Sequence, residues 1–124
     1  MSESVCVFVV DDDPLIAMTI EHALDDAGFE SRSAGSSAEI MALFKQQGEI
    51  CRALITDVNL GEARTGWDVA RDARERFPNL PIVYVTGDSA HEWTVQGVPN
   101  SILVGKPFVA AQLITAVATL LNAS

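Results

Sequence analysis

Residues 5–14 read VCVFVVDDDP: six apolar residues, then three aspartates, Asp11, Asp12 and Asp13, and a proline. A second apolar stretch, ALIT at residues 53–56, ends at Asp57. If the two runs form neighbouring strands of one parallel sheet, their carboxyl ends lie side by side, where open α/β sheets bind their ligands. Several carboxylates would then share one pocket and need a cation, and Mg²⁺ prefers such oxygen ligands. The sequence therefore predicts an acidic, magnesium-dependent site.

Short apolar runs rich in β-branched residues recur along the chain and predict five strands buried on both faces. These runs lie at residues 5–10, 29–33, 53–56, 81–86 and 101–104. The run at 29–33 is the weakest and alternates in character, which favours a place at the edge of the sheet.

Helical patterns separate the strands, at residues 14–27, from 36 past 44, at 65–77 and at 108–121. Ser36 with Glu39, and Thr65 with Asp68, have the spacing of capping boxes. The segment 87–100 contains a glycine and a proline, so its helix should be short, frayed or absent. This alternation predicts an α/β fold, a doubly wound parallel sheet with right-handed crossovers.

The chain has 124 residues, 48% of them hydrophobic, and a formal charge of −9. This size favours a single domain that spans residues 1–124, and we expect no output domain after the last helix. The acidic charge disfavours binding to nucleic acid or to anionic membranes. The N-terminus lacks the basic region of a signal peptide. The segment 107–124 is uncharged, but its apolar stretch at 109–121 is too short for a membrane span. We therefore expect a cytoplasmic protein without membrane insertion.

Several residues that could carry chemistry have simpler roles. Cys6 and Cys51 lack metal-ligand spacing, so we expect them to pack in the core. His22 and His91 also lack ligand spacing and should lie on the surface. Trp93, in the short fourth crossover, is either a packing residue or a contact for a partner.

Three further residues fall where this topology brings them to the aspartates: Thr86 at the end of the fourth strand, and Lys106 and Pro107 just after the fifth. An aspartate can act as a nucleophile toward a phosphoryl group. Catalysis of such a transfer consists mainly of positioning and of cations around the phosphoryl oxygens. Asp13 is different, because an N-cap with proline at the first helical position explains it.

Four segments closely resemble the receiver domains of two-component response regulators: VVDDDP at 9–14, LITDVNL at 54–60, VYVTG at 83–87 and GKPF at 105–108. The resemblance covers nearly the whole chain, and four motifs in the right order at strand ends are highly specific. A chemotaxis receiver is a familiar example of the flavodoxin-like fold with strand order 2-1-3-4-5. The resemblance implies that order here.

The resemblance also implies a role for each polar residue. Asp57 resembles the phosphoacceptor, and Asp11 and Asp12 resemble the acidic pair that binds Mg²⁺ together with Asp57. Asn59 would add its backbone carbonyl to this metal site. With Asp88, Asn59 would also flank the path of the water that hydrolyses the acyl phosphate.

Lys106 resembles the lysine that pairs with the phosphoryl group in this family. The bond between Lys106 and Pro107 resembles the family's cis peptide, which would aim the ammonium into the site. Thr86 resembles the switch hydroxyl that responds to phosphorylation.

Two features depart from the family pattern. Many receivers place an aromatic residue three positions before the lysine, where this chain has Leu103. The aromatic half of the switch is missing or is supplied elsewhere, with Tyr84 as the candidate. Together with the shortened fourth crossover, this is similar to an atypical alphaproteobacterial subgroup of receivers with a reduced fourth helix.

The resemblance implies that a histidine kinase or a histidine phosphotransfer protein presents phosphohistidine to Asp57. The phosphorylated protein would then bind a downstream protein target, or act as a shuttle or sink for phosphoryl groups. It would catalyse its own phosphorylation and dephosphorylation, and it would not be an enzyme that turns over a separate substrate. The uncharged last helix, whose residues off the core stripe are Ala110, Ile114, Ala118 and Leu121, is a candidate docking or homodimer face.

Two alternatives remain open. The Asp-x-Asp pattern after the first strand also occurs in phosphatases of the haloacid-dehalogenase type, in which Asp11 would be the nucleophile. Such an enzyme would turn over free phosphomonoesters. The chain could also be a receiver that works as a phosphorylation-independent interaction module, and its partner binding would then be indifferent to Asp57→Asn.

Overall fold

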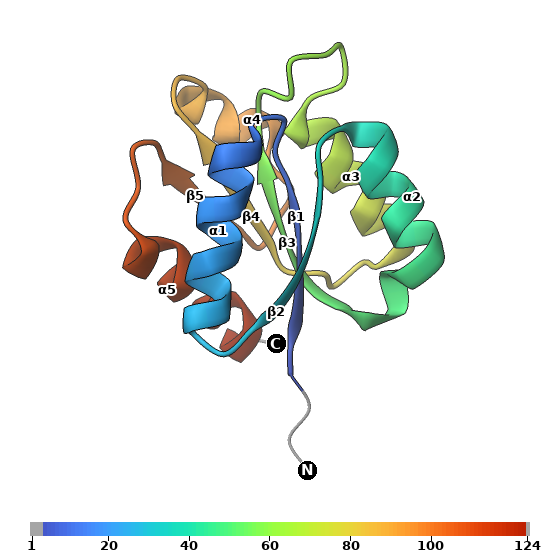
Figure 1. The fold of residues 1–124 in the computed structure, drawn as a ribbon. Coiled ribbons are helices and arrows are strands. Elements are labelled where there is room, and N and C mark those ends of the chain that lie inside the picture. The colour runs from blue at the N-terminus through green and yellow to red at the C-terminus, as the bar shows by residue number, and fades with distance from the viewer. Residues whose placement is uncertain (1–3, 124) are drawn as a thin grey trace.

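The computed structural model describes residues 4–123, and its five strands form one fully parallel sheet (Figure 1). The strands are β1 (Cys6–Val10), β2 (Glu30–Ala34), β3 (Cys51–Asp57), β4 (Ile82–Thr86) and β5 (Ser101–Gly105). Their order is β2-β1-β3-β4-β5, with every neighbouring pair parallel. The predicted flavodoxin-like fold and strand order are confirmed, as is the position of the second strand at an edge.

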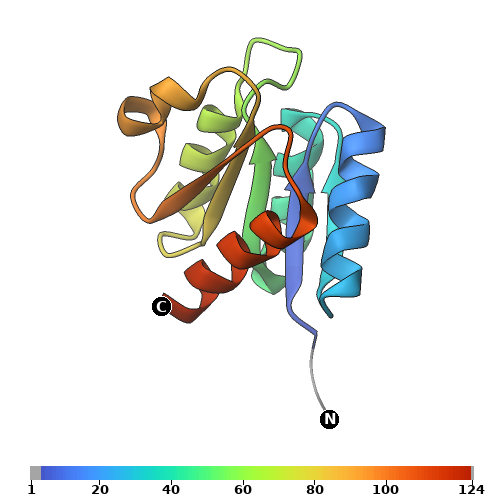
Figure 2. The same ribbon diagram turned by 90° about the vertical axis from the view of Figure 1, so that its left-hand side faces the viewer.

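Helices cover both faces of the sheet: α1 and α5 lie on one face, and α2 and α3 lie on the other (Figures 1 and 2). The helices are α1 (Pro14–Asp26), α2 (Ser37–Gln47), α3 (Gly66–Arg76), α4 (Trp93–Gln96) and α5 (Ala110–Ala123). Short 3₁₀ turns precede β3 and α4, at Gly48–Ile50 and Ala90–Glu92. The expected reduction of the fourth helix is confirmed, since α4 has only 4 residues.

The hydrophobic core has two halves, one on each face of the sheet. Successive residues of a strand point to opposite faces, so Val7 and Val9 pack toward α1 and α5, and Phe8 and Val10 pack toward α2 and α3. This two-sided burial explains why the strands read as unbroken apolar runs. Each fully buried side chain of this size stabilises the fold by about 2 kcal/mol.

Both cysteines belong to the core half on the α2 and α3 side. Cys6 and Cys51 are buried, and the two residues lie opposite each other on β1 and β3. Burial raises the pKa of the Cys51 thiol to about 12 and also raises the pKa of Cys6. The predicted packing role is therefore confirmed, and these thiols stay protonated at neutral pH.

The predicted cap of the first helix is confirmed. The Asp13 side chain accepts a hydrogen bond from the Leu15 N–H at 2.9 Å, and Pro14 is the first helical residue. The interaction satisfies one of the amide groups that the start of a helix leaves unpaired. Asp13 is thus used in folding, which separates its role from that of Asp11 and Asp12.

Of the two predicted capping boxes, one is complete. Thr65 and Asp68 bond each other's backbone at the start of α3. At the start of α2, Ser36 accepts from the Glu39 N–H, but the Glu39 carboxylate accepts from the N–H of Gly35, at 3.0 Å. The predicted capping box at Ser36 was therefore wrong for the Glu39 side chain. Its carboxylate bonds the N–H of Gly35, one residue before the N–H of Ser36 that a capping box would use.

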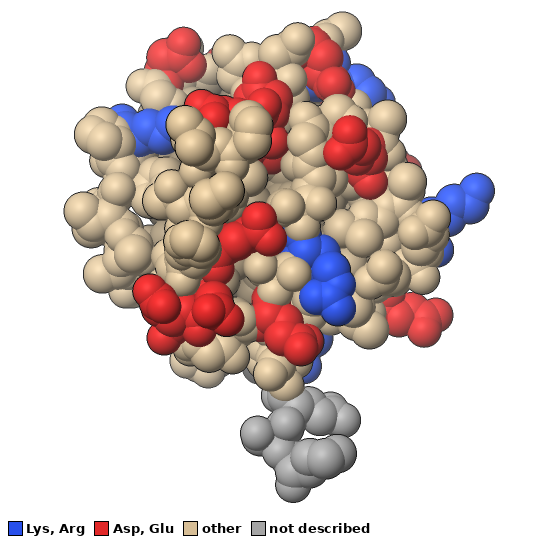
Figure 3. Space-filling view, in the orientation of Figure 1, with Lys and Arg blue, Asp and Glu red and all other residues tan. Residues whose placement is uncertain are grey.

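The last helix starts at Ala110, two residues later than predicted, where the Gln112 side chain accepts the Val109 N–H. Of the residues expected off its core stripe, Ile114 and Leu121 are half-buried against the core, and Ala110 is exposed. The uncharged face is therefore smaller than expected. In Figure 3 the left-hand edge of the view is largely tan, whereas acidic side chains are scattered widely over the rest, including the lower left. No helix within residues 4–123 is long and apolar enough to span a membrane.

Candidate functional site

Three carboxylates meet at the carboxyl end of the sheet. Asp11 directly follows β1, Asp57 is the last residue of the neighbouring strand β3, and Asp12 is next along the chain. One carboxylate oxygen from each of the three lies within 4.8 Å of the other two. The structure thus brings together the three aspartates that the sequence placed at one edge.

Asp11 is the most deeply buried of the three, with 2% of its surface exposed. Its Oδ1 accepts a hydrogen bond from the Asp13 N–H at 2.8 Å, while its Oδ2 is buried and accepts no hydrogen bond. Burial, reinforced by the negative charge of Asp57, raises the pKa of Asp11 to about 6, although the hydrogen bond from Asp13 opposes this. An ionised Asp11 therefore has one buried oxygen without a hydrogen bond.

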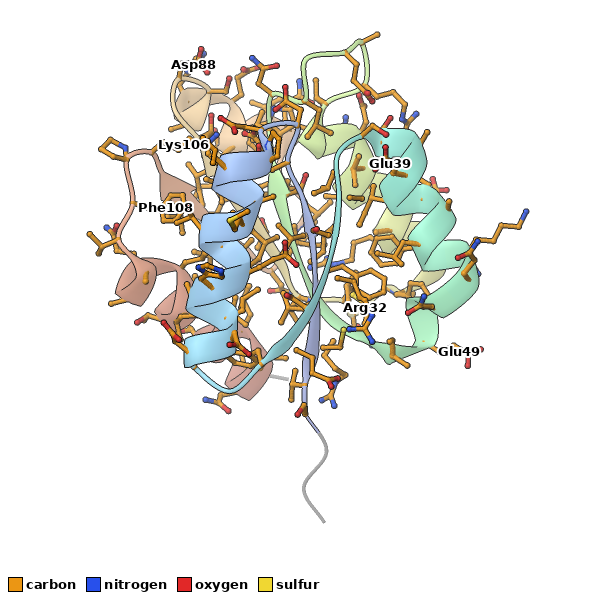
Figure 4. The ribbon with its side chains drawn as sticks, viewed as in Figure 1. Arg32, Glu39, Glu49, Asp88, Lys106 and Phe108 are labelled. Atoms are coloured by element: carbon orange, nitrogen blue, oxygen red, sulfur yellow. The ribbon has the colours of Figure 1, made fainter. Side chains whose placement is uncertain are left out.

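Lys106 supplies the nearest positive charge. Its Nζ lies 3.3 Å from Asp57 Oδ2 and 3.9 Å from Asp11 Oδ2, the second distance being too long for a hydrogen bond. Burial raises the pKa of Asp57, and the ammonium of Lys106 partly opposes that rise. The peptide bond between Lys106 and Pro107 is cis, as predicted. Figure 4 shows Lys106 and Asp88 at the upper end of the molecule, where the strands have their carboxyl ends.

The donor set fits Mg²⁺. One lysine faces three carboxylates, so ionising all of them leaves the pocket negatively charged. Asp11 Oδ2 is a buried acceptor without a hydrogen-bond donor, and a cation would satisfy it. Carboxylate oxygens are the ligands that Mg²⁺ uses in proteins, usually one or two carboxylates beside water and phosphate.

Thr86 closes the site on the side of β4. It is buried, and its hydroxyl accepts a hydrogen bond from the Ser89 N–H at 2.9 Å. Its carbonyl accepts the Lys106 N–H at 2.8 Å, so the backbones of Thr86 and Lys106 are joined directly. Asp88, one residue before Ser89, accepts that serine's hydroxyl. The Thr86 hydroxyl therefore couples the site to the start of the fourth crossover.

Asn59 lies in the loop after β3, two residues beyond Asp57. Its side-chain oxygen accepts the Gly61 N–H at 3.0 Å, which shapes the loop as a tight turn. This bond involves the Asn59 side chain and not its backbone carbonyl, which was predicted as a metal ligand. That ligand role stays a prediction.

Tyr84 holds the other end of the fourth crossover. Its ring is fully buried against Trp67, with ring centroids 4.5 Å apart, and its hydroxyl accepts the Val98 N–H. Trp93 packs against the same core half and donates to Ser101. Tyr84 is thus a fixed anchor in this structure, and Trp93 has the packing role that was predicted as one of two possibilities.

The remaining candidates lie outside the site. His22 and His91 are exposed, and within residues 4–123 the three aspartates form the one group that could hold a metal ion.

The sequence did not predict two neighbours of the site: Ser89, which bonds Thr86, and Gly61, whose backbone lies against Asp12. The glycine two residues after Asn59 was a signal for a turn, but nothing in the sequence placed that turn against Asp12.

A parallel α/β sheet with an aspartate cluster, a lysine joined by a cis peptide bond to the following proline, and a threonine at the end of β4 has the features of a receiver class of signalling domain. The chain belongs to the response regulator receiver domain family, whose model matches residues 7–118. This family is a signalling module and not a substrate-turnover enzyme, so the phosphatase alternative finds no support.

A solved response regulator receiver protein from Sinorhizobium medicae is 44% identical, with a TM-score of 0.92, over 98% of this chain and 97% of that chain. A curated response regulator receiver protein from Anaeromyxobacter is 36% identical over 87% of this chain and 42% of its own length. Part of the sensor kinase CckA of Brucella abortus is 27% identical over 98% of this chain and 13% of the kinase.

The chain spans about half or less of the curated relatives that it matches first, between 40% and 51% of their length. Receiver domains as a family bind Mg²⁺ at an acidic pocket and interact with histidine kinases and downstream effectors. This chain has the fold and the acidic pocket of that family.

Proposed function

We propose that this protein is a phosphoacceptor in two-component or phosphorelay signalling, with Asp57 as the residue that receives the phosphoryl group. The observation that carries the proposal is the 3.3 Å contact between Asp57 Oδ2 and Lys106 Nζ, inside a cluster that also contains Asp11 and Asp12. In the proposed reaction an Asp57 oxygen attacks the phosphorus atom of a phosphohistidine. A P–O bond forms, the P–N bond breaks, and its electron pair returns to the imidazole nitrogen.

Each neighbouring residue has a defined part in this proposal. Lys106 holds Asp57 in place and pairs with the negative charge of the transferred group. Asp11, Asp12 and Asp57, with the backbone carbonyl of Asn59, would hold Mg²⁺, which when bound neutralises the carboxylates and the phosphoryl oxygens. Asn59 and Asp88 flank the path of the hydrolytic water.

Phosphorylation would act on the fold through Thr86. Its hydroxyl bonds Ser89 in this structure, and a phosphoryl group on Asp57 would offer it a stronger, charged acceptor. If Thr86 turns to that acceptor, the Ser89 N–H loses its partner and the start of the fourth crossover is released. This local change would alter the surface that a downstream protein recognises.

The proposed partners are a histidine kinase or histidine phosphotransfer protein as donor and a downstream protein as target, all in the cytoplasm. A sink role needs only the donor, whereas a shuttle also needs an acceptor for the phosphoryl group. A homodimer through α5 would use its uncharged surface, where two chains of charge −9 repel each other least. Sedimentation of the protein with and without phosphorylation tests this dimer.

The central test is the intact mass of the protein after incubation with phosphoramidate, with and without Mg²⁺. Asp57→Asn is the matched variant, because it keeps the size of the side chain. We expect the wild type to gain the mass of one phosphoryl group only with Mg²⁺, and the variant to gain none. No gain from phosphoramidate or from a purified phosphotransfer protein would overturn the proposal and favour a phosphorylation-independent interaction module.

A further inference from the structure

Asp12 differs from the other two aspartates in how it is held. Its side chain is exposed, and within residues 4–123 no hydrogen bond or ion pair reaches its carboxylate. Even so, one of its oxygens lies within 4.8 Å of those of Asp11 and Asp57. An exposed, unbonded carboxylate is free to rotate away from this cluster unless a packing contact restricts it.

That contact comes from Gly61, in the loop between β3 and α3. A Cβ atom added to Gly61 would lie 2.8 Å from Asp12 Oδ2, closer than real Cβ contacts. Gly61 also has a φ of +69°, in the left-handed region that favours glycine. The absence of a side chain therefore allows the loop backbone to lie directly beside the Asp12 carboxylate.

The loop is anchored on its other side, so it cannot easily move outward. The carboxylate of Glu62 accepts hydrogen bonds from the N–H and the hydroxyl of Ser37, at the start of α2. The base of the loop is closed by the Gly66 N–H, which donates to the Val58 carbonyl at 2.8 Å. A side chain at position 61 would thus displace the free end of Asp12 rather than the loop.

We propose that Gly61 is a positioning residue for the cation site: its bare backbone limits the rotation of the Asp12 carboxylate and keeps an oxygen aimed toward Asp11 and Asp57. This inference rests on the proposed function, because it takes Asp12 as a ligand of Mg²⁺. Residues that orient metal ligands typically change metal affinity by 10-fold to 100-fold when they are replaced.

The test is calorimetric titration of the metal-free protein with Mg²⁺, which measures binding without phosphorylation. Gly61→Ala adds a Cβ and strains the backbone, whereas Gly61→Asn adds a Cβ at a conformation that asparagine tolerates. We expect both variants to bind Mg²⁺ at least about 10-fold more weakly than the wild type. Gly28→Ala is the matched control, because Gly28 has a φ of +90° with no atom within 4 Å of its added Cβ. It should keep the wild-type affinity.

A double-mutant cycle with Asp12→Ala shows whether Gly61 acts through Asp12. In the Asp12→Ala background, Gly61→Asn should cause no further loss of affinity. The inference would be overturned if Gly61→Asn lowered the Mg²⁺ affinity as much in the Asp12→Ala background as in the wild type. Wild-type affinity in both Gly61 variants would also overturn it. Weak binding by Gly61→Ala alone would identify backbone strain as the cause and would also overturn it. If the wild type binds no Mg²⁺, the proposed metal site itself fails.

Discussion

The hydroxyl of Tyr84 accepts a hydrogen bond from the backbone N–H of Val98, at 3.1 Å. Thr86, two residues along the same strand and on the same face, accepts the N–H of Ser89. The two side chains therefore hold the two ends of the fourth crossover. Thr86 directly follows Val85, the β4 residue that pairs with Asp57, while the Tyr84 ring is buried against Trp67. Phosphorylation should thus free the start of the crossover and leave its end in place.

Replacing Tyr84 by Phe should loosen the end of the crossover. The ring still fills the core, but the Val98 N–H loses its acceptor, which costs about 1 kcal/mol in the free energy of unfolding. Amide hydrogen exchange at Val98 should become faster, while exchange at Ser89 should not change. Unfolding in urea measures the free energy. An unchanged exchange rate at Val98 would show that the tyrosine hydroxyl does not anchor the crossover.

Asp11 predicts a pH dependence of stability in the metal-free protein. Its pKa is about 6 in the folded protein, above the ordinary value of 3.8, so the folded state binds the proton more tightly than the unfolded chain does. The stabilising contribution of the protonated group is complete below pH 4 and is lost as the pH rises through about 6. The interval from 3.8 to about 6 corresponds to at most about 3 kcal/mol.

Asp11→Asn keeps the shape of the protonated acid and removes this loss. We expect the variant to be more stable than the wild type by roughly 1 to 3 kcal/mol at pH 8 in the presence of a chelator. At pH 3.5 the two proteins should be equally stable, so each pH value is the control for the other. Urea unfolding at both values measures the difference. If Asp11→Asn were more stable than the wild type by the same amount at both pH values, ionisation of Asp11 would not be the source of the difference.

The sheet and the aspartate cluster could both be predicted from the sequence, for a geometric reason. Parallel strands end at one edge of the sheet, so residues at or directly after the ends of β1, β3, β4 and β5 lie along that edge, whatever the loops do. Asp11, Asp57 and Thr86 could therefore be placed from strand positions alone. The cap at Asp13 was equally accessible, because it depends on residues two positions apart.

Contacts between separate loops could not be predicted. Glu62 bonds Ser37, which lies 25 residues earlier, and Gly61 lies against Asp12, far from it along the chain. Such contacts depend on the path of each loop in space, which no local pattern encodes. The error at Glu39 has a related cause, since two neighbouring N–H groups competed for one carboxylate and the sequence does not rank them.

Lys106→Gln should slow phosphorylation of Asp57. The ammonium of Lys106 opposes the rise of the Asp57 pKa that burial causes, and it lies 3.3 Å from Oδ2. Without it, the Asp57 pKa rises further and the carboxylate is held less firmly. We expect labelling by phosphoramidate at neutral pH to fall by about tenfold, the equivalent of one charged hydrogen bond. Lys45→Gln, which removes an exposed lysine of α2, should label at the wild-type rate.

Mg²⁺ should stabilise the wild-type protein at neutral pH, because it binds the folded aspartate cluster and no equivalent site exists in the unfolded chain. At a concentration 100 times the dissociation constant, the free energy of unfolding should rise by about 2.7 kcal/mol. The increase should shrink between pH 7 and pH 5, since protonation of Asp11, whose pKa is about 6, removes a ligand. Thermal unfolding with Mg²⁺ or a chelator at both pH values measures this increase.

Asp12→Asn leaves the buried pair of Asp11 and Asp57 intact and should lose most of the increase in stability that Mg²⁺ causes. If Mg²⁺ stabilised Asp12→Asn as much as it stabilises the wild type, Asp12 would not be a ligand of the metal.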